Sequence, residues 1–66
     1  MDILMMDIKE LRKAAGLTQR QLADAAGLNI RQVQKIEAGE IEPGNMTAKN
    51  VFALADALGV DARRLI

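Results

Sequence analysis

The stretch from residue 16 to residue 39 constrains the fold of this chain more than any other. Its apolar residues recur at helical spacing in two segments of about two turns each, and glycines at 16, 27 and 39 bound them. Only a very short turn separates the two segments. The second segment offers an outward row of long polar and basic side chains. The rest of the 66 residues is expected to support this unit.

Residues that cap helices predict where the elements begin and end. Side chains able to accept from free backbone N–H groups stand at Asp7, Thr18, Asn29, Thr47 and Asp61. Three of them have a Glu or Gln three positions later, as in a capping box. A glycine follows four of the periodic segments. We expect helices over residues 7–15, 18–26, 29–38, 47–58 and 61–66, and the first could begin as early as Asp2.

Composition favours one compact helical domain over residues 1–66, in which residues 1–6 form an N-terminal segment or extend the first helix. Half of the residues are apolar, and Phe52 is the only aromatic one, which does not suit a β-sandwich or barrel. Phe52 is expected to close one edge of the core. The expected core comprises Ile8, Leu11, Leu17, Leu22, Ala23, Ala26, Leu28, Val33, Ile36, Val51, Leu54, Ala55, Leu58, Val60 and Leu65.

The residue types that are absent exclude several functions. Without Cys, no disulfide or thiolate metal site can form, and without His the commonest general base and metal ligand is missing. We therefore expect no catalytic residues, no cofactor, no metal and no small-molecule substrate. No apolar run is long enough for a bilayer and no signal peptide is evident, so we expect a cytoplasmic protein without a membrane partner.

Charge is segregated along the chain although the net charge is zero. Residues 8–36 hold six Lys and Arg against two acidic residues, whereas residues 37–61 hold one Lys against five acidic residues. The local field matters for docking onto phosphates more than the sum does. The first half of the chain therefore suits a polyanion.

Several of these segments resemble the lambda-repressor-like, Cro-type (XRE-like) helix-turn-helix family. The matching parts are IKELRKAAGLTQ at residues 8–19, Leu22-Ala23, Gly27, IEAG at 36–39 and LADALGVD at 54–61. The similarity extends over about residues 8 to 66. It implies an all-α, compact five-helix DNA-binding domain with the helix-turn-helix at its second and third helices. Members of the family bind operator DNA, usually as dimers.

The helix expected over residues 29–38 provides most of the candidate site. At 100° per residue, inward Val33 and Ile36 turn Arg31, Gln34 and Lys35 outward and leave Ile30 and Gln32 on the flanks. Arg can pair bidentately with guanine and Gln with adenine, whereas Ile can only touch a thymine methyl. At the start of the preceding helix, free N–H groups suit a phosphate oxygen. The expected DNA-binding residues are Thr18, Gln19, Arg20, Ile30, Arg31, Gln32, Gln34 and Lys35.

Thr18 and Gln19 have more specific expected roles, and an ion pair between the first and third helices is also expected. Thr18 is expected to serve mainly as a cap, and the resemblance implies that Gln19 touches the DNA backbone or a base. The resemblance also implies that Arg12 pairs with Glu37 across the first and third helices, as a structural ion pair that fixes the angle of the recognition helix. A buried pair of this kind is costly to break.

The loop after the third expected helix departs from the family pattern. Glu40 and Glu42 stand where many members have basic or amide residues, and two carboxylates there would repel DNA unless they point away. Asn45 is the only plausible amide contact in this loop.

The leading hypothesis is sequence-specific binding of double-stranded DNA by a small transcriptional regulator, a repressor, with residues 29–38 in the major groove. A weak homodimer would raise its affinity. Leu65, Ile66 and residues 1–6 either form an apolar seam between two copies or fold back onto the core. The alternative, motivated by the neutral net charge and the acidic loop, is a protein-interaction module or antitoxin-like component. Such a protein would keep the fold with weak or no DNA binding.

Overall fold

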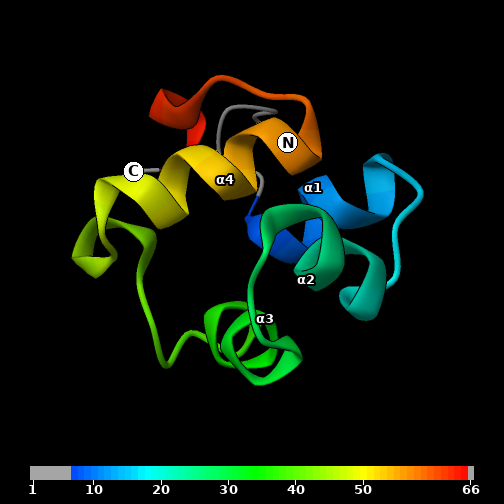
Figure 1. Ribbon diagram of the computed structural model, residues 1–66, viewed down its shortest axis with the longest axis horizontal. Helices are drawn as coiled ribbons and strands as arrows, with labels where there is room; N and C mark the ends of the chain where they lie inside the picture. The colour runs from blue at the N-terminus through cyan, green and yellow to red at the C-terminus, as the bar shows by residue number, and fades with distance from the viewer. Residues whose placement is uncertain (1–6, 66) are drawn as a thin grey trace.

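The computed structural model describes residues 7–65, and the regular secondary structure in this part of the chain is all helical (Figure 1). Four α-helices are joined by short connections, and two single 3-10 turns follow the third and fourth of them. The elements are α1 (Ile8–Ala14), α2 (Gln19–Ala26), α3 (Ile30–Glu37), η2 (Pro43–Asn45), α4 (Ala48–Leu58) and η3 (Ala62–Arg64).

The capping residues act as the sequence predicts. Thr18 Oγ1 accepts from Gln21 N at 3.0 Å, and Gln21 Oε1 accepts from Thr18 N at 2.8 Å, which completes a capping box at the start of α2. At the start of α3, Asn29 Oδ1 accepts from the N–H of Arg31, while the side chain of Gln32 accepts from the N–H of Asn29. These bonds satisfy N–H groups that no helical carbonyl reaches.

Gly27 makes the turn between α2 and α3 short. Its φ of +67° lies in the left-handed region, which glycine adopts without a Cβ penalty. Leu28 N then donates back to Ala23 O at 2.8 Å and closes the end of α2. Only residues 27–29 separate the two helices, so α3 leaves α2 at a defined angle.

The C-terminal segment corrects the prediction of a fifth helix. Residues 61–66 were expected to be helical, but the described part forms one 3-10 turn, η3, and Ile66 lies outside the described residues. Its backbone bonds run from Arg64 N to Asp61 O and from Leu65 N to Ala62 O, each to the third residue back. So short a segment has little intrinsic helicity, and its conformation follows from its packing against α4.

Residues 40–46 were expected to be a plain loop and contain the single turn η2. Pro43 stands at its first position, where a fixed φ and a missing N–H cost nothing. An earlier start for the first helix, at Asp2, falls outside the described residues. Asp7 has extended backbone and accepts from Glu10 N at 2.9 Å, so it is the N-cap of α1.

The core is built from residues of all four α-helices. Leu22, Val33 and Leu54, one each from α2, α3 and α4, are completely enclosed. Four of the expected core residues are only half-buried, although all four pack against the core: Leu17, Leu28, Val60 and Leu65. The other expected core residues are buried: Ile8, Leu11, Ala23, Ala26, Ile36, Val51, Ala55 and Leu58.

Phe52 does not close an edge of the core. Its residue is 60% exposed, because Val51, Leu54 and Ala55 set the inward face of α4 and Phe52 is turned about 100° from Val51.

The packing leaves one side of α3 open. α3 contacts α2 and α1, while α4 packs on α2 and carries η3. In Figure 1, α3 lies at the lower edge of the molecule, away from α4, and no other helix lies beyond it. The fold therefore presents the outer face of α3 to the surroundings.

Candidate nucleic-acid interface

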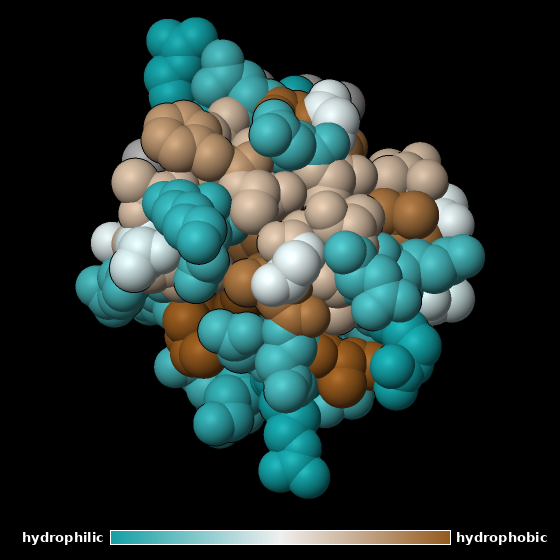
Figure 2. Space-filling view, in the orientation of Figure 1, coloured by the Kyte–Doolittle hydropathy of each residue, from teal (hydrophilic) through white to brown (hydrophobic). Residues whose placement is uncertain are grey.

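The outer face of α3 carries the longest polar side chains of the helix. Val33 and Ile36 are buried, whereas Arg31, Gln34 and Lys35 are exposed, as the helical spacing predicts. These three side chains line a shallow surface hollow of about 490 Å³ together with Ala38 and Glu40. Figure 2 shows hydrophilic side chains projecting from the lower edge, the side on which Figure 1 places α3.

The two cations of this face, Arg31 and Lys35, are not paired within residues 7–65. No hydrogen bond or ion pair in that range engages either side chain; the bond from Arg31 to Asn29 Oδ1 uses the backbone N–H of Arg31. The residues are four apart, so their side chains form one ridge along the helix. An unpaired cationic ridge is available to an acceptor from outside, such as a phosphate or guanine.

The flanking residues are partly committed to the fold. Ile30 is half-buried and packs against the core, which leaves only part of its side chain for an apolar contact. Gln32 is exposed, but its Oε1 accepts from Asn29 N at 3.0 Å. Its amide nitrogen remains as the donor that it could offer to a ligand.

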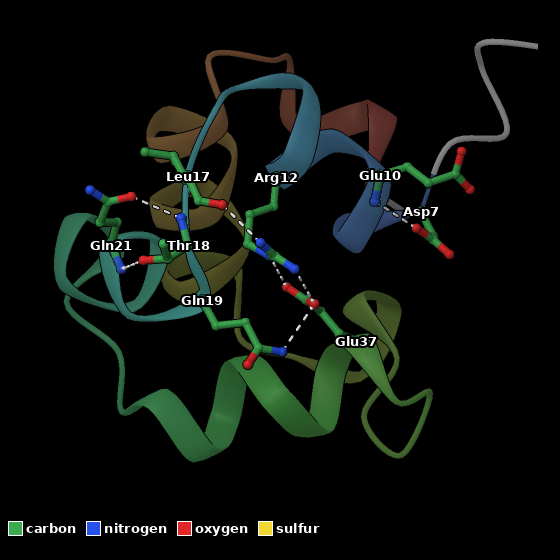
Figure 3. A network of polar contacts seen from close by, with 8 residues as sticks. All are labelled: Asp7, Glu10, Arg12, Leu17, Thr18, Gln19, Gln21 and Glu37. Carbon is green, nitrogen blue, oxygen red and sulfur yellow. Dashed lines mark hydrogen bonds and ion pairs between the residues drawn. The ribbon is translucent and has the colours of Figure 1, made fainter.

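The start of α2 lies close to α3 and combines a cap, an amide and a cation. Thr18 forms the capping box described above, in agreement with its expected main role. Arg20 is exposed, and no partner holds its side chain within the described part of the chain. Gln19 is half-buried, and its Nε2 lies 3.2 Å from Glu37 Oε1 (Figure 3).

Arg12 and Glu37 join α1 to the end of α3. Arg12 Nε lies 2.6 Å from Glu37 Oε2, and Arg12 Nη2 donates to Glu37 Oε1 at 3.1 Å (Figure 3). The two side chains are 11% and 4% exposed. The hydrogen bond to Glu37 raises the pKa of Arg12 above its usual value, against the opposing effect of burial. This pair is therefore a buried, bidentate ion pair.

The remaining donors and acceptors around the pair are also used. Arg12 Nη1 donates to Leu17 O at 2.8 Å, and Gln19 adds a third bond to Glu37. Within residues 7–65 no buried side-chain polar atom lacks a partner. The cluster ties α1, the loop before α2 and the first residue of α2 to the last residue of α3. It holds the helix that carries Arg31 and Lys35 against the rest of the domain.

The acidic loop divides into two different environments. Glu40 lines the hollow of the outer face of α3, whereas Glu42 does not and precedes η2 as its N-cap. Asn45, the expected amide contact, is exposed within η2. Sequence reasoning treated the two carboxylates alike, and no local signal in the sequence separates them. The backbone bond from Glu40 N to Lys35 O, at 2.9 Å, is what places Glu40 beside the helix.

Between residues 7 and 65 no helix combines the length and apolar character that crossing a bilayer requires. The same residues bring no three acidic, His or Cys side chains together as a metal site.

A model of the helix-turn-helix family matches residues 8–65. A curated relative, the transcriptional repressor RstR of the cryptic phage CTXphi from Vibrio cholerae serotype O1, is 39% identical over 64 residues. That alignment covers 91% of this chain and 54% of the relative, so the chain spans about half the length of the relative.

A solved structure is similar as well. The restriction-modification controller protein C.AhdI from Aeromonas hydrophila superposes with a TM-score of 0.78 and is 37% identical. The match covers 89% of this chain and 85% of that one. Both similar proteins are named for regulation or control, and neither is named as an enzyme.

Proposed function

Because the chain belongs to the helix-turn-helix family, a class of DNA-binding transcription regulators, we propose that it binds double-stranded DNA in a sequence-specific way and represses transcription. The observation that carries the proposal is the unpaired ridge of Arg31 and Lys35 on the open side of α3. In this proposal α3 enters the major groove, where a helix fits and each base pair presents a distinct pattern of donors and acceptors.

The side chains divide into base-reading and phosphate-binding groups. Arg31 and Gln34 reach base edges, Lys35 supports them from the next turn, and the exposed part of Ile30 touches a thymine methyl. Arg20, Gln19 and the first N–H groups of α2 meet the phosphate backbone beside the groove. Thr18 contributes by holding that helix end in shape.

The acidic loop supports one rival function, a protein-interaction module that kept the fold and binds DNA weakly or not at all. An antitoxin-like component belongs to the same alternative. Glu40 and Glu42 follow α3 directly, where a carboxylate opposes phosphate binding. In the preferred function the free cations of α2 and α3 outweigh this repulsion. The two functions predict different salt dependence, so one measurement separates them.

The test is equilibrium binding to a randomised duplex DNA pool across a range of salt concentrations. A DNA-binding domain should lose affinity linearly in log salt, with a slope that reports the number of phosphates engaged. Repeated selection from the pool should enrich a defined sequence. Absence of binding at about 50 mM salt, where electrostatic contacts are strong, would favour the interaction module.

A single copy offers a small footprint, so the proposal includes a weak homodimer on a two-fold site. Half-sites about 34 Å apart would place one α3 in each of two successive major grooves. Of the apolar seam expected from the chain ends, Leu65 packs partly on the core, and Ile66 and residues 1–6 lie outside the described residues. Exposed Phe52 and half-buried Met46 line an apolar hollow of about 280 Å³, which suits the contact between copies.

A further inference from the structure

The hollow on the outer face of α3 combines two cations with one carboxylate. Arg31, Gln34 and Lys35 line it from the helix, and Glu40 lines it from the segment that follows. Glu40 is exposed, and within residues 7–65 its carboxylate takes part in no hydrogen bond or ion pair, including with either neighbouring cation. An acceptor-only group therefore faces the same space as the cationic ridge.

Glu40 is held in place by the backbone. Its N–H donates to Lys35 O at 2.9 Å, and the N–H of Ile41 reaches the same carbonyl at 3.3 Å. Ile41 is half-buried and packs against the core, which anchors the chain directly after Glu40. The carboxylate therefore projects from the end of α3 and not from the middle of a long connection.

A carboxylate at this position discriminates between the groups that DNA presents. Phosphate oxygens and guanine O6 and N7 are acceptors, so they are repelled by it or gain nothing from it. The exocyclic N4 amino group of cytosine is a donor in the major groove, and Glu is a side chain that accepts from it. The same carboxylate thus weakens binding to most sequences and strengthens binding to some.

We propose that Glu40 is a specificity-determining residue, which accepts a hydrogen bond from cytosine N4 at one base pair of the site read by α3. This inference rests on the proposed function, since it requires that α3 lies in the major groove. Arg31 and Glu40 then select opposite partners from one hollow, a guanine acceptor and a cytosine donor. The carboxylate also lowers the affinity for DNA of unrelated sequence.

Glu42 provides a matched control. It carries the same charge two residues later and is exposed, but it does not line the hollow. Glu40→Gln and Glu42→Gln each remove one negative charge with little change in size. A general electrostatic effect should be similar in the two variants, whereas a base contact belongs to Glu40 alone.

The experiment compares the wild-type chain with both variants by selection from a randomised duplex DNA pool, sequencing of the bound fraction and direct titration of the unselected pool. For Glu40→Gln we expect the preference for cytosine at one position to fall roughly fivefold or more, with a shift toward adenine, which Gln can pair bidentately. Titration should show tighter binding to the unselected pool. Glu42→Gln should keep the wild-type sequence preference.

Two results would overturn the proposal. One is an unchanged preference at every position for Glu40→Gln, with a gain in affinity equal to that of Glu42→Gln, which would make Glu40 only one of two repulsive charges. The other is a preference altered equally by both variants. Binding of duplex DNA by the wild-type chain separates both results from failure of the proposed function. A wild-type chain that binds no duplex would contradict the proposed function itself. Circular dichroism of both variants checks that they are folded.

Discussion

Arg12 is a side chain that links α3 directly to α1. It is buried, donates to Glu37 twice and donates to Leu17 O, so its guanidinium bridges α1, the following loop and α3. Charge pairs of this kind are poor evidence for net stability, since both groups lose their hydration. Their value here is geometric, because the planar guanidinium fixes both oxygens of Glu37.

Removing half of this pair should be costly. Arg12→Ala leaves the carboxylate of Glu37 buried with only Gln19 as a donor, so the free energy of unfolding should fall by about 3–5 kcal/mol. Urea titration followed by circular dichroism measures it. Arg63→Ala is the control, because the Arg63–Asp61 pair is exposed and its loss should leave the urea midpoint nearly unchanged. A loss below about 1 kcal/mol for Arg12→Ala would mean that the pair behaves as a surface contact.

Asp61 should titrate at unusually low pH. Hydrogen bonds from the side chain and backbone of Arg63 lower its pKa from 3.8 to about 2. Because the folded-state pKa is the lower one, any stabilisation from this group is present above pH 3.8 and is lost as the pH falls through about 2. NMR titration of the Asp61 carboxyl carbon should show this pKa in the wild type and a higher one in Arg63→Ala, which keeps only the hydrogen bond from the backbone N–H. Identical curves for the two proteins would contradict the pairing.

At the scale of elements, the turn from α2 to α3 determines how the outer face of α3 is presented. Gly27 has a φ of +67°, and apart from its two chain neighbours no residue has an atom within 4 Å of where its Cβ would be. The cost of a side chain there is therefore backbone strain alone, with no steric clash. Gly44, in η2, also has open space around it but no positive φ. A comparison of the two positions therefore isolates the effect of the positive φ.

Gly27→Ala should lower the free energy of unfolding by about 1–2 kcal/mol, the cost of an L-residue in the left-handed region. Gly44→Ala should be neutral or slightly stabilising, since it removes freedom mainly from the unfolded chain. Thermal melts of the two variants provide the comparison. Equal effects on the melting temperature would show that the turn tolerates a right-handed alternative, and the defined angle between α2 and α3 would lose its explanation.

The sequence predicts most element ends because capping is local chemistry. Thr18 with Gln21 and Asn29 with Gln32 mark the starts of α2 and α3 within four residues of sequence. The 3-10 geometry of η3 depends on packing against α4, which no nearby residue encodes. The prediction that Phe52 closes an edge of the core was wrong. It relied on the apolar character of the side chain and not on the position of Phe52 next to inward-facing Val51 in the helix.

The sequence predicts the part of the candidate site that lies on α3, but not the part that lies in the segment after α3. Helical spacing alone turns Arg31, Gln34 and Lys35 outward, and they are exposed. Glu40 and Glu42 could not be distinguished, because which of them lines the hollow depends on the path of the chain after α3. The hydrogen bond from Gln19 to Glu37 likewise could not be predicted, because it depends on how α2 and α3 pack in the tertiary structure.

At the scale of the whole molecule, the outer face of α3 and the hollow beside Phe52 are lined by different residues. None of the residues that line the hollow belongs to α3; they are Pro43, Gly44, Met46, Ala48, Val51, Phe52, Ala62 and Arg63. A second copy could therefore occupy the hollow without using the side chains proposed to read DNA. Two copies would engage more phosphates than one, which raises both affinity and salt dependence.

Phe52→Ser should weaken self-association without unfolding the domain, since the side chain is largely exposed and not part of the core. Sedimentation equilibrium at micromolar concentration should show a monomer–dimer equilibrium in the wild type that shifts toward monomer in the variant. Binding to a selected two-fold DNA site should weaken in parallel. A wild type that stays monomeric both free and on DNA would remove the homodimer from the account.

If the cations on the outer face of α3 bind DNA, charge-matched double variants should differ in their affinity for it. Arg31→Ala/Lys35→Ala removes two positive charges from α3, and Lys9→Ala/Lys13→Ala removes two exposed ones from α1. Affinity for a duplex selected by the wild-type chain should fall by about 3 kcal/mol or more in the α3 variant and by about 1 kcal/mol in the α1 variant. Equal losses, or full sequence-selective binding by a folded α3 variant, would contradict the account.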